Sequence, residues 1–121
     1  MSRIIERIEL ITRQEQKIKL DIADIIKKDA MLPEKIELLT SIPGIGKLTA
    51  VIIIAETNGF ELIRNKKQLV SYAGLDVKEL ISGISVKGKP RISKRGNQHV
   101  RKAMHMPALA AIRRMDGLRQ Y

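Results

Sequence analysis

The chain has 121 residues, a formal net charge of +10, no cysteine and 2% aromatic residues. This length fits one domain, or a small core with an extended appendage. The absence of cysteine excludes disulfides, zinc-thiolate sites and cysteine nucleophiles. The shortage of aromatic side chains argues against binding single strands by base stacking. No apolar run is long enough to cross a membrane and no signal peptide is evident, so we expect a cytoplasmic protein.

The positive charge is concentrated near the C-terminus. Residues 1–30 and 31–86 each hold nearly equal numbers of acidic and basic side chains, whereas residues 87–121 hold ten Lys or Arg and one Asp. Because a solvated surface usually mixes both signs, this segment indicates binding to a polyanion. A generally basic protein without such a partner is the alternative that composition leaves open.

Residues 3–29 contain no Gly or Pro and predict one long helix. Isoleucines recur every seven residues, two more occupy the complementary register, and Glu15 fills the slot between those two. The seam consists of Ile4, Ile8, Ile11, Ile18, Ile22 and Ile25. Such a seam needs a partner, either another chain or the second arm of a long hairpin. We therefore expect a coiled-coil helix over residues 1–32 that forms a homo-oligomer.

Residues 33–121 are expected to form a second, helical domain, so the predicted fold class is mainly α. A short helix is expected before the Pro-Gly-Ile-Gly sequence at residues 43–46, another after it, and a third over residues 66–73 with Asn65 as its N-cap. The last helix is expected from Asn97 to about residue 115, kinked near Pro107.

A short basic hairpin or loop is expected between the third and last helices of this domain. The segments 84–86 and 91–93 have weak strand character, and they flank Lys87-Gly88-Lys89-Pro90, which is typical of a turn. The sequence therefore predicts at most two short strands, with the chain reversing at residues 87–90.

The segment 39–50 resembles the helix-hairpin-helix family of non-sequence-specific DNA-binding motifs. Its two glycines let the backbone turn tightly and approach a ligand. The amide groups that begin the second helix, at its positive dipole end, can hold a phosphate. A helical hairpin without a ligand is the alternative. We assign DNA contacts to Gly44, Ile45, Gly46 and Lys47, with the Ile45 side chain directed into the core.

Several further motifs follow in order along the chain. They are Tyr72-Ala73-Gly74-Leu75, Ser82-Gly83, Ile92-Ser93-Lys94-Arg95-Gly96-Asn97 and Arg101-Lys102-Ala103. With the preceding hairpin, these motifs resemble, over roughly residues 36–112, the C-terminal domain of the Piv-like insertion-sequence transposases and DNA invertases. That family pairs a RuvC-like acidic domain with a serine-bearing domain, and the heptad helix corresponds to the coiled coil that links them.

The resemblance implies a serine nucleophile that attacks a DNA phosphodiester and forms a covalent phosphoserine link during strand exchange. Ser82 holds that place in the motif, with Ser85 and Ser93 as rivals. The family activates its serine with a carboxylate tetrad and Mg²⁺ on the acidic domain. No Asp-rich β-α unit precedes residue 33, so we expect a fragment that holds no metal or cofactor and does not cleave DNA alone.

The expected partner is DNA, and a structured guide RNA is a further candidate. The assigned contacts in the basic segment are cations, together with Ser93, whose hydroxyl and backbone can meet a phosphate. They are Lys87, Lys89, Arg91, Ser93, Lys94, Arg95 and Arg101. Two alternatives to a recombinase remain open: a non-catalytic helix-hairpin-helix module of repair or recombination, and a coiled-coil interaction protein.

Overall fold

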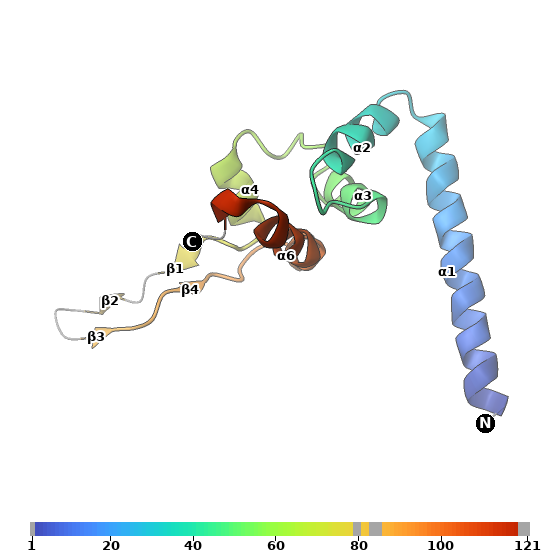
Figure 1. Ribbon diagram of the computed structural model, residues 1–121, viewed down its shortest axis with the longest axis horizontal. Helices are drawn as coiled ribbons and strands as arrows, with labels where there is room; N and C mark the ends of the chain where they lie inside the picture. The colour runs from blue at the N-terminus through green and yellow to red at the C-terminus, as the bar shows by residue number, and fades with distance from the viewer. Residues whose placement is uncertain (1, 79–80, 83–85, 119–121) are drawn as a thin grey trace. The chain divides into compact units, whose positions relative to one another are not determined.

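The computed structural model describes residues 2–78, 81–82 and 86–118. It divides into two compact units, residues 1–35 and 36–121. Helices account for most of the structure and strands for little of it, as expected from the sequence (Figure 1). No helix within the described ranges is both long enough and apolar enough to cross a membrane.

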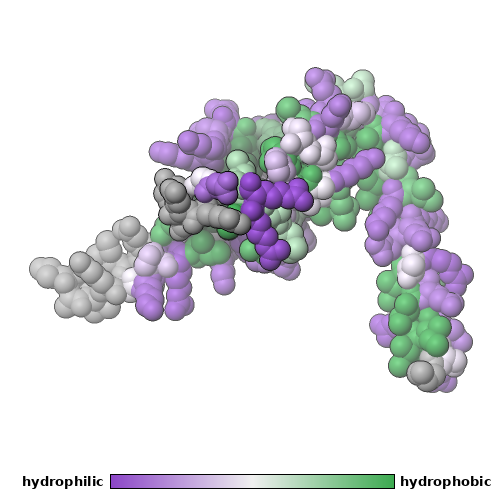
Figure 2. Space-filling view, in the orientation of Figure 1, coloured by the Kyte–Doolittle hydropathy of each residue, from purple (hydrophilic) through white to green (hydrophobic). Residues whose placement is uncertain are grey.

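Helix α1 (Ser2–Lys28) makes up most of the first unit and follows the predicted range. None of its residues is buried, and the seam isoleucines Ile4 and Ile25 are 65% and 62% exposed. Apolar side chains gather along one side of this helix (Figure 2). Lys19 Nζ lies 2.6 Å from the Glu15 carboxylate, one helical turn away. This hydrogen bond, with the lysine's charge, lowers the pKa of Glu15.

Asp29 lies between α1 and the next helix, α2 (Leu32–Thr40). Its carboxylate accepts hydrogen bonds from the amides of Met31 at 2.7 Å and Leu32 at 3.0 Å. These two bonds lower the pKa of Asp29. Pro33 lies in the first turn of α2, where a helix does not need the missing amide.

The second unit is built around the pairing of α3 with α5. Ala50 of α3 is fully buried and Val100 of α5 is 2% exposed, so small and branched side chains let the two helices approach closely. Thr57, also fully buried, donates its hydroxyl to the carbonyl oxygen of Ile53 at 2.7 Å. The helical elements of the unit after α2 are α3 (Lys47–Glu56), α4 (Lys66–Tyr72), α5 (Gln98–Ala103), α6 (His105–Arg114) and the 3-10 helix η1 (Asp116–Leu118).

The expected capping residues are confirmed. The Asn65 side chain accepts from the amide of Gln68 at 2.9 Å and begins α4. The helix predicted from Asn97 to about residue 115 is divided at Met104 into α5 and α6, so the disturbance expected near Pro107 is confirmed and the continuity of the helix is not. A proline in the middle of a helix removes one hydrogen bond and clashes with the carbonyl four residues earlier. The break places Pro107 in the first turn of α6, where neither penalty applies.

Four two-residue strands form an antiparallel arm, here called the basic arm, that leads from α4 to α5 (Figure 1). Strand β1 (Val77–Lys78) pairs with β4 (Arg91–Ile92), and β2 (Ile81–Ser82) pairs with β3 (Val86–Lys87). The predicted reversal at residues 87–90 and the limit of two strands are therefore wrong. Ser82 pairs with Val86, so the chain has already reversed before Val86.

The two ends of the basic arm meet where Gly74 and Gly96 approach each other, a contact we call the glycine joint. A Cβ atom added to Gly74 would lie 2.6 Å from the amide nitrogen of Gly96. One added to Gly96 would collide with the Tyr72 carbonyl oxygen and the Gly74 nitrogen. The Asn97 amide donates to the carbonyl oxygen of Tyr72 at 2.6 Å. Only glycine permits this approach.

Side chains lock the glycine joint to the helices around it. Asn97 Oδ1 caps α5 by accepting from the amides of its first turn, while Asn97 Nδ2 donates to the Glu56 carboxylate at 2.6 Å. The Tyr72 hydroxyl donates to the carbonyl oxygen of Glu56 at 2.6 Å, and Arg101 Nη1 donates to that of Ala73 at 2.8 Å. The ends of α3 and α4 and the start of α5 are therefore held together at one point.

Replacing Gly96 with alanine should destabilise the protein by about 3 kcal/mol or more, because the new methyl group would force the glycine joint apart. Gly46→Ala is the matched control, since a Cβ atom there meets nothing within 4 Å. It should change the stability by no more than about 1 kcal/mol. Urea unfolding of the two variants measures the difference, and equal losses of stability would contradict the account of the joint.

Candidate nucleic-acid interface

The turn between α2 and α3 packs against α6 on one side. Gly44 has a φ of +94°, and a Cβ atom there would lie 2.8 Å from the Ala110 Cβ and 3.1 Å from the Pro107 carbonyl oxygen. Ile45 is 8% exposed, and its amide donates to the carbonyl oxygen of Ile42 at 3.1 Å. Gly44 and Ile45 thus hold the turn in place, and the Ile45 side chain lies in the core as expected.

The start of α3 is open to solvent. Gly46 is extended, with φ −82° and ψ 168°, and provides no side-chain cap. The first helical amide with a backbone partner is that of Ala50, which donates to the Gly46 carbonyl at 3.0 Å. Within the described residues, the amides of Lys47, Leu48 and Thr49 make no hydrogen bond, and the Lys47 side chain is exposed. Unsatisfied amides at the positive end of a helix, beside a cation, can hold an anion.

The basic arm carries exposed cations on its paired strands. Lys78 on β1 lies directly opposite Arg91 on β4, so the two positive side chains project from the same face. Like charges placed opposite each other destabilise a strand pair. Lys89, Lys94 and Arg95 are exposed as well. In the part of the chain that the structure describes, none of these five cations forms an ion pair, so their charge is available to a ligand.

The base of the arm is held by Asp76 and Ser93. The Ser93 hydroxyl donates to the Asp76 carboxylate at 2.7 Å, and its amide donates to the Asp76 carbonyl oxygen at 2.8 Å. Lys94 follows in the left-handed conformation, with φ +54°, which is unfavourable for a side chain other than Gly, Asn or Asp. The Lys94 amide donates to Gly74 at 3.0 Å, which keeps the strained residue at the glycine joint.

Two of the residues to which the sequence analysis assigned DNA contacts use their polar groups within the fold. The hydroxyl of Ser93 is engaged by Asp76, and the guanidinium of Arg101 is half-buried against the end of α4. Asp76 and Ala73, which accept these two hydrogen bonds, are far in sequence from Ser93 and Arg101, so a short motif cannot reveal them. Lys78 and Asp76 were not assigned from the sequence. Asp76 directly follows the Tyr-Ala-Gly-Leu motif, and the register of the strands, once known, singles out Lys78.

Ser82 lies on β2 of the basic arm and Lys87 on the adjacent strand β3. The structure therefore brings Ser82, Lys87 and Arg91 onto one arm, although it places Arg91 on the other strand pair. The rival Ser85 lies outside the described residues. Within the described ranges, no three His, Asp or Glu residues come together in a group that could hold a metal ion.

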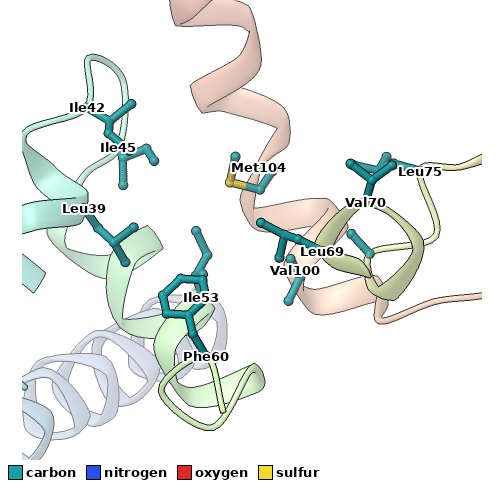
Figure 3. Close-up of a pocket in the computed structure, with 11 residues that line it drawn as sticks. Leu39, Ile42, Ile45, Ile53, Phe60, Leu69, Val70, Leu75, Val100 and Met104 are labelled. Carbon is teal, nitrogen blue, oxygen red and sulfur yellow. The ribbon is translucent and has the colours of Figure 1, made fainter. Parts of the chain in front are cut away.

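An apolar cavity of about 270 Å³ lies within the second unit (Figure 3). Its eleven lining residues are all apolar, and they include Leu39 of α2, Ile45 of the turn, Ile53 of α3 and Met104 between α5 and α6. These side chains offer no charge or hydrogen bond to a polar ligand. The cavity therefore offers no site for a phosphate.

Comparison with known proteins identifies relatives of the second unit. A family model described as "Transposase IS116/IS110/IS902 family" matches residues 36–121. The chain is 36% identical over 78 residues to the pilin gene-inverting protein of Moraxella bovis, covering 64% of this chain and 24% of that protein. It is 39% identical over 75 residues to the pilin gene-inverting protein of Moraxella lacunata, covering 60% and 22%.

A third relative is the insertion element IS110 uncharacterized 43.6 kDa protein of Streptomyces coelicolor, 31% identical over 83 residues, or 69% of this chain and 20% of that protein. The chain thus spans about a quarter or less of the length of these relatives. The expected kinship with transposases and DNA-inverting proteins is confirmed at the level of the family. Because the family model covers most of the chain, this protein belongs to the IS116/IS110/IS902 family of transposases.

Proposed function

We propose that residues 36–121 form the DNA-binding part of a recombinase, which holds the sugar-phosphate backbone between the start of α3 and the basic arm. The observation that carries the proposal is the pair of opposed cations, Lys78 and Arg91, with no acidic partner within the described residues. In the free protein these charges repel each other, and a phosphate placed between them relieves the repulsion. Lys94, in the left-handed conformation, adds a third cation, which is held at a conformational cost.

The start of α3 supports the same function independently of the arm. Its open amides and the exposed Lys47 offer a phosphate site, and the bare Gly46 lets a backbone come close. Both elements recognise phosphate, which carries no sequence information. The proposed binding is therefore largely independent of DNA sequence. A structured guide RNA presents the same phosphate chemistry and is proposed as a competing ligand.

The affinity for duplex DNA should fall steeply as salt rises, because neutralised phosphates release counterions. The variants Lys78→Thr and Lys94→Gly should each reduce the slope of log affinity against log salt by about 0.9, the value for one lost phosphate contact. Each should nevertheless unfold at no lower temperature than the wild type, since the first removes like-charge repulsion and the second removes backbone strain. Fluorescence anisotropy and thermal unfolding measure the two effects.

The matched control is Arg13→Ala, which removes an exposed cation from α1 in the first unit. It should leave the salt slope unchanged. Affinity that persists at high salt, or that is absent at low salt, would contradict DNA binding. Tighter binding to a structured RNA than to duplex DNA of equal length would instead make RNA the principal ligand.

We further propose that Ser82 is the nucleophile of the recombination reaction. The support is its place in the motif order of the resembling family and its position on the cationic arm. The serine hydroxyl gives up its proton as its oxygen forms a bond to phosphorus, the bond from phosphorus to one deoxyribose oxygen breaks, and that oxygen takes up a proton. The cations of the arm stabilise the added negative charge. Mg²⁺ on an acidic domain would activate the hydroxyl, and no residue of this chain is proposed to hold it.

When the chain is joined to an acidic, metal-binding domain of the family, Ser82→Ala should lower strand exchange by at least about a thousandfold, because the attacking oxygen is lost. DNA affinity should stay close to that of the unmodified protein. Ser85→Ala is the control and should recombine DNA normally. If Ser82→Ala recombines DNA as well as the unmodified protein does, the chain is better explained as a DNA-binding module without a nucleophile of its own.

We also propose that α1 pairs with α1 of a second copy along the isoleucine seam. The support is that the seam is regular and mostly exposed: Ile11 and Ile18 are 53% and 57% exposed, and only Ile22 of the six isoleucines is half-buried. Water-exposed apolar side chains at this spacing gain free energy when another helix covers them. The charged Glu15 within the seam favours one register over others.

Substituting Ile11 and Ile18 together with lysine should convert an oligomer into a monomer, because two charges would enter the seam. Lysine is a good helix former, so the helical content should be kept. Leu20→Lys is the control, since Leu20 is 70% exposed but lies outside the seam. Sedimentation equilibrium measures the mass of each variant. A wild-type monomer, or an equally large complex for the double variant, would contradict this pairing.

A further inference from the structure

A carboxylate lies at the base of an arm whose other charged residues are mostly basic. Asp76 and Ser93 are both half-buried and share two hydrogen bonds, one through the serine hydroxyl at 2.7 Å and one through the serine amide at 2.8 Å. This pair directly continues the β1–β4 ladder, in which Val77 pairs with Ile92. The hydroxyl-to-carboxylate bond adds a side-chain contact to a row of backbone contacts, and the Arg95 amide in turn donates to Ser93 Oγ at 3.4 Å.

The same row leads from the arm into the glycine joint. After Ser93, the Lys94 amide donates to the Gly74 carbonyl oxygen, and Gly96 then packs against Gly74. The bond from Ser93 to Asp76 therefore lies between the joint and the first strand pair. Strand pairs of two residues are too short to fix their own direction, so a contact at this place determines how the arm leaves the helices.

The charge of Asp76 acts against the binding proposed for the arm. Asp76 lies two residues before Lys78, and its partner Ser93 lies between Arg91 and Lys94, so its carboxylate lowers the positive charge that a phosphate meets on the arm. By charge alone, removing it would strengthen DNA binding. By geometry, removing it takes the side-chain bond from the base of the arm and leaves only the backbone bonds to set the direction of the arm. The two effects have opposite signs, so an experiment can separate them.

We propose that Asp76 is a positioning residue, which fixes the direction of the basic arm by accepting the Ser93 hydroxyl so that the arm's cations meet the DNA backbone together. This inference rests on the proposed function. Asp76 acts through Ser93 and the arm and does not touch the ligand. The hydroxyl of Ser93 accordingly serves the arm's geometry, and phosphate contact falls to the neighbouring cations.

The test compares Asp76→Ala, Asp76→Asn and Ser93→Ala in the whole chain. Loss of a hydrogen bond to a charged acceptor should weaken duplex DNA binding about tenfold in Asp76→Ala, despite the gain of one positive charge. Ser93→Ala removes the same contact and also the longer one in which the Arg95 amide donates to Ser93 Oγ at 3.4 Å, so it should weaken binding at least as much, and the double variant no more than Ser93→Ala alone. Asparagine keeps an acceptor oxygen without the charge, so Asp76→Asn should bind at least as tightly as the wild type.

Glu37→Ala is the matched control for charge. Glu37 is exposed on α2, and its carboxylate makes no hydrogen bond or ion pair among the described residues. Its removal should leave DNA binding unchanged or tighter. Hydrogen exchange of the Ser93 and Lys94 amides in the free protein gives a readout that needs no DNA. Both amides should exchange faster in Asp76→Ala than in the wild type, and at the wild-type rate in Glu37→Ala.

The outcomes separate the inference from the function on which it rests. DNA binding by Asp76→Ala as tight as that by Glu37→Ala would overturn the positioning role and leave DNA binding intact. Unchanged amide exchange in Asp76→Ala would also overturn it, whatever the wild type binds. A wild type without salt-sensitive binding would overturn the proposed function itself. A loss in Asp76→Ala that Asp76→Asn does not restore would overturn the role assigned to the acceptor oxygen.

Discussion

The contact between Gly74 and Gly96 is the constraint on which the second unit depends. It joins two backbone segments that are 22 residues apart in sequence, at a distance in space that only glycine permits. Around it, Asn97, Tyr72 and Arg101 each use a polar group to tie one helix end to another. The Gly-Asn and Tyr-Ala-Gly-Leu motifs therefore meet in one contact, the glycine joint, and the basic arm extends from it.

Because of this arrangement, some motif residues anchor the fold and others present positive charge. Ser93 and Arg101 were assigned to phosphate from the sequence, yet their groups are engaged within the fold, as are Gly96 and the helix-capping Asn97 between them. The exposed cations alternate with them. Anchoring groups and exposed cations share one short segment, so a rigid frame can present charge without a large core beneath it.

Local signals predicted the structure well where the relevant partner is near in sequence. The α1 helix follows its heptads, and Asn65 and Asn97 cap helices two or three residues away. The register of the arm was mispredicted because it depends on contacts made between Gly74 and Gly96, which no short window displays. Pro107 showed that a helix would be disturbed but not that it would break at Met104. The opposed pair of Lys78 and Arg91 became visible only once the strands were aligned.

The closed base of the arm also bears on how its outer part can vary. A loop whose ends are already joined loses little more chain entropy when it grows, about 0.6 kcal/mol for each doubling of its length. Residues inserted between β2 and β3 would extend the reach of the arm while leaving the helices and the glycine joint as they are. The outer part of the arm can thus become longer or shorter during evolution at a small cost in the free energy of folding. The arm could then reach binding surfaces at different distances from the helices.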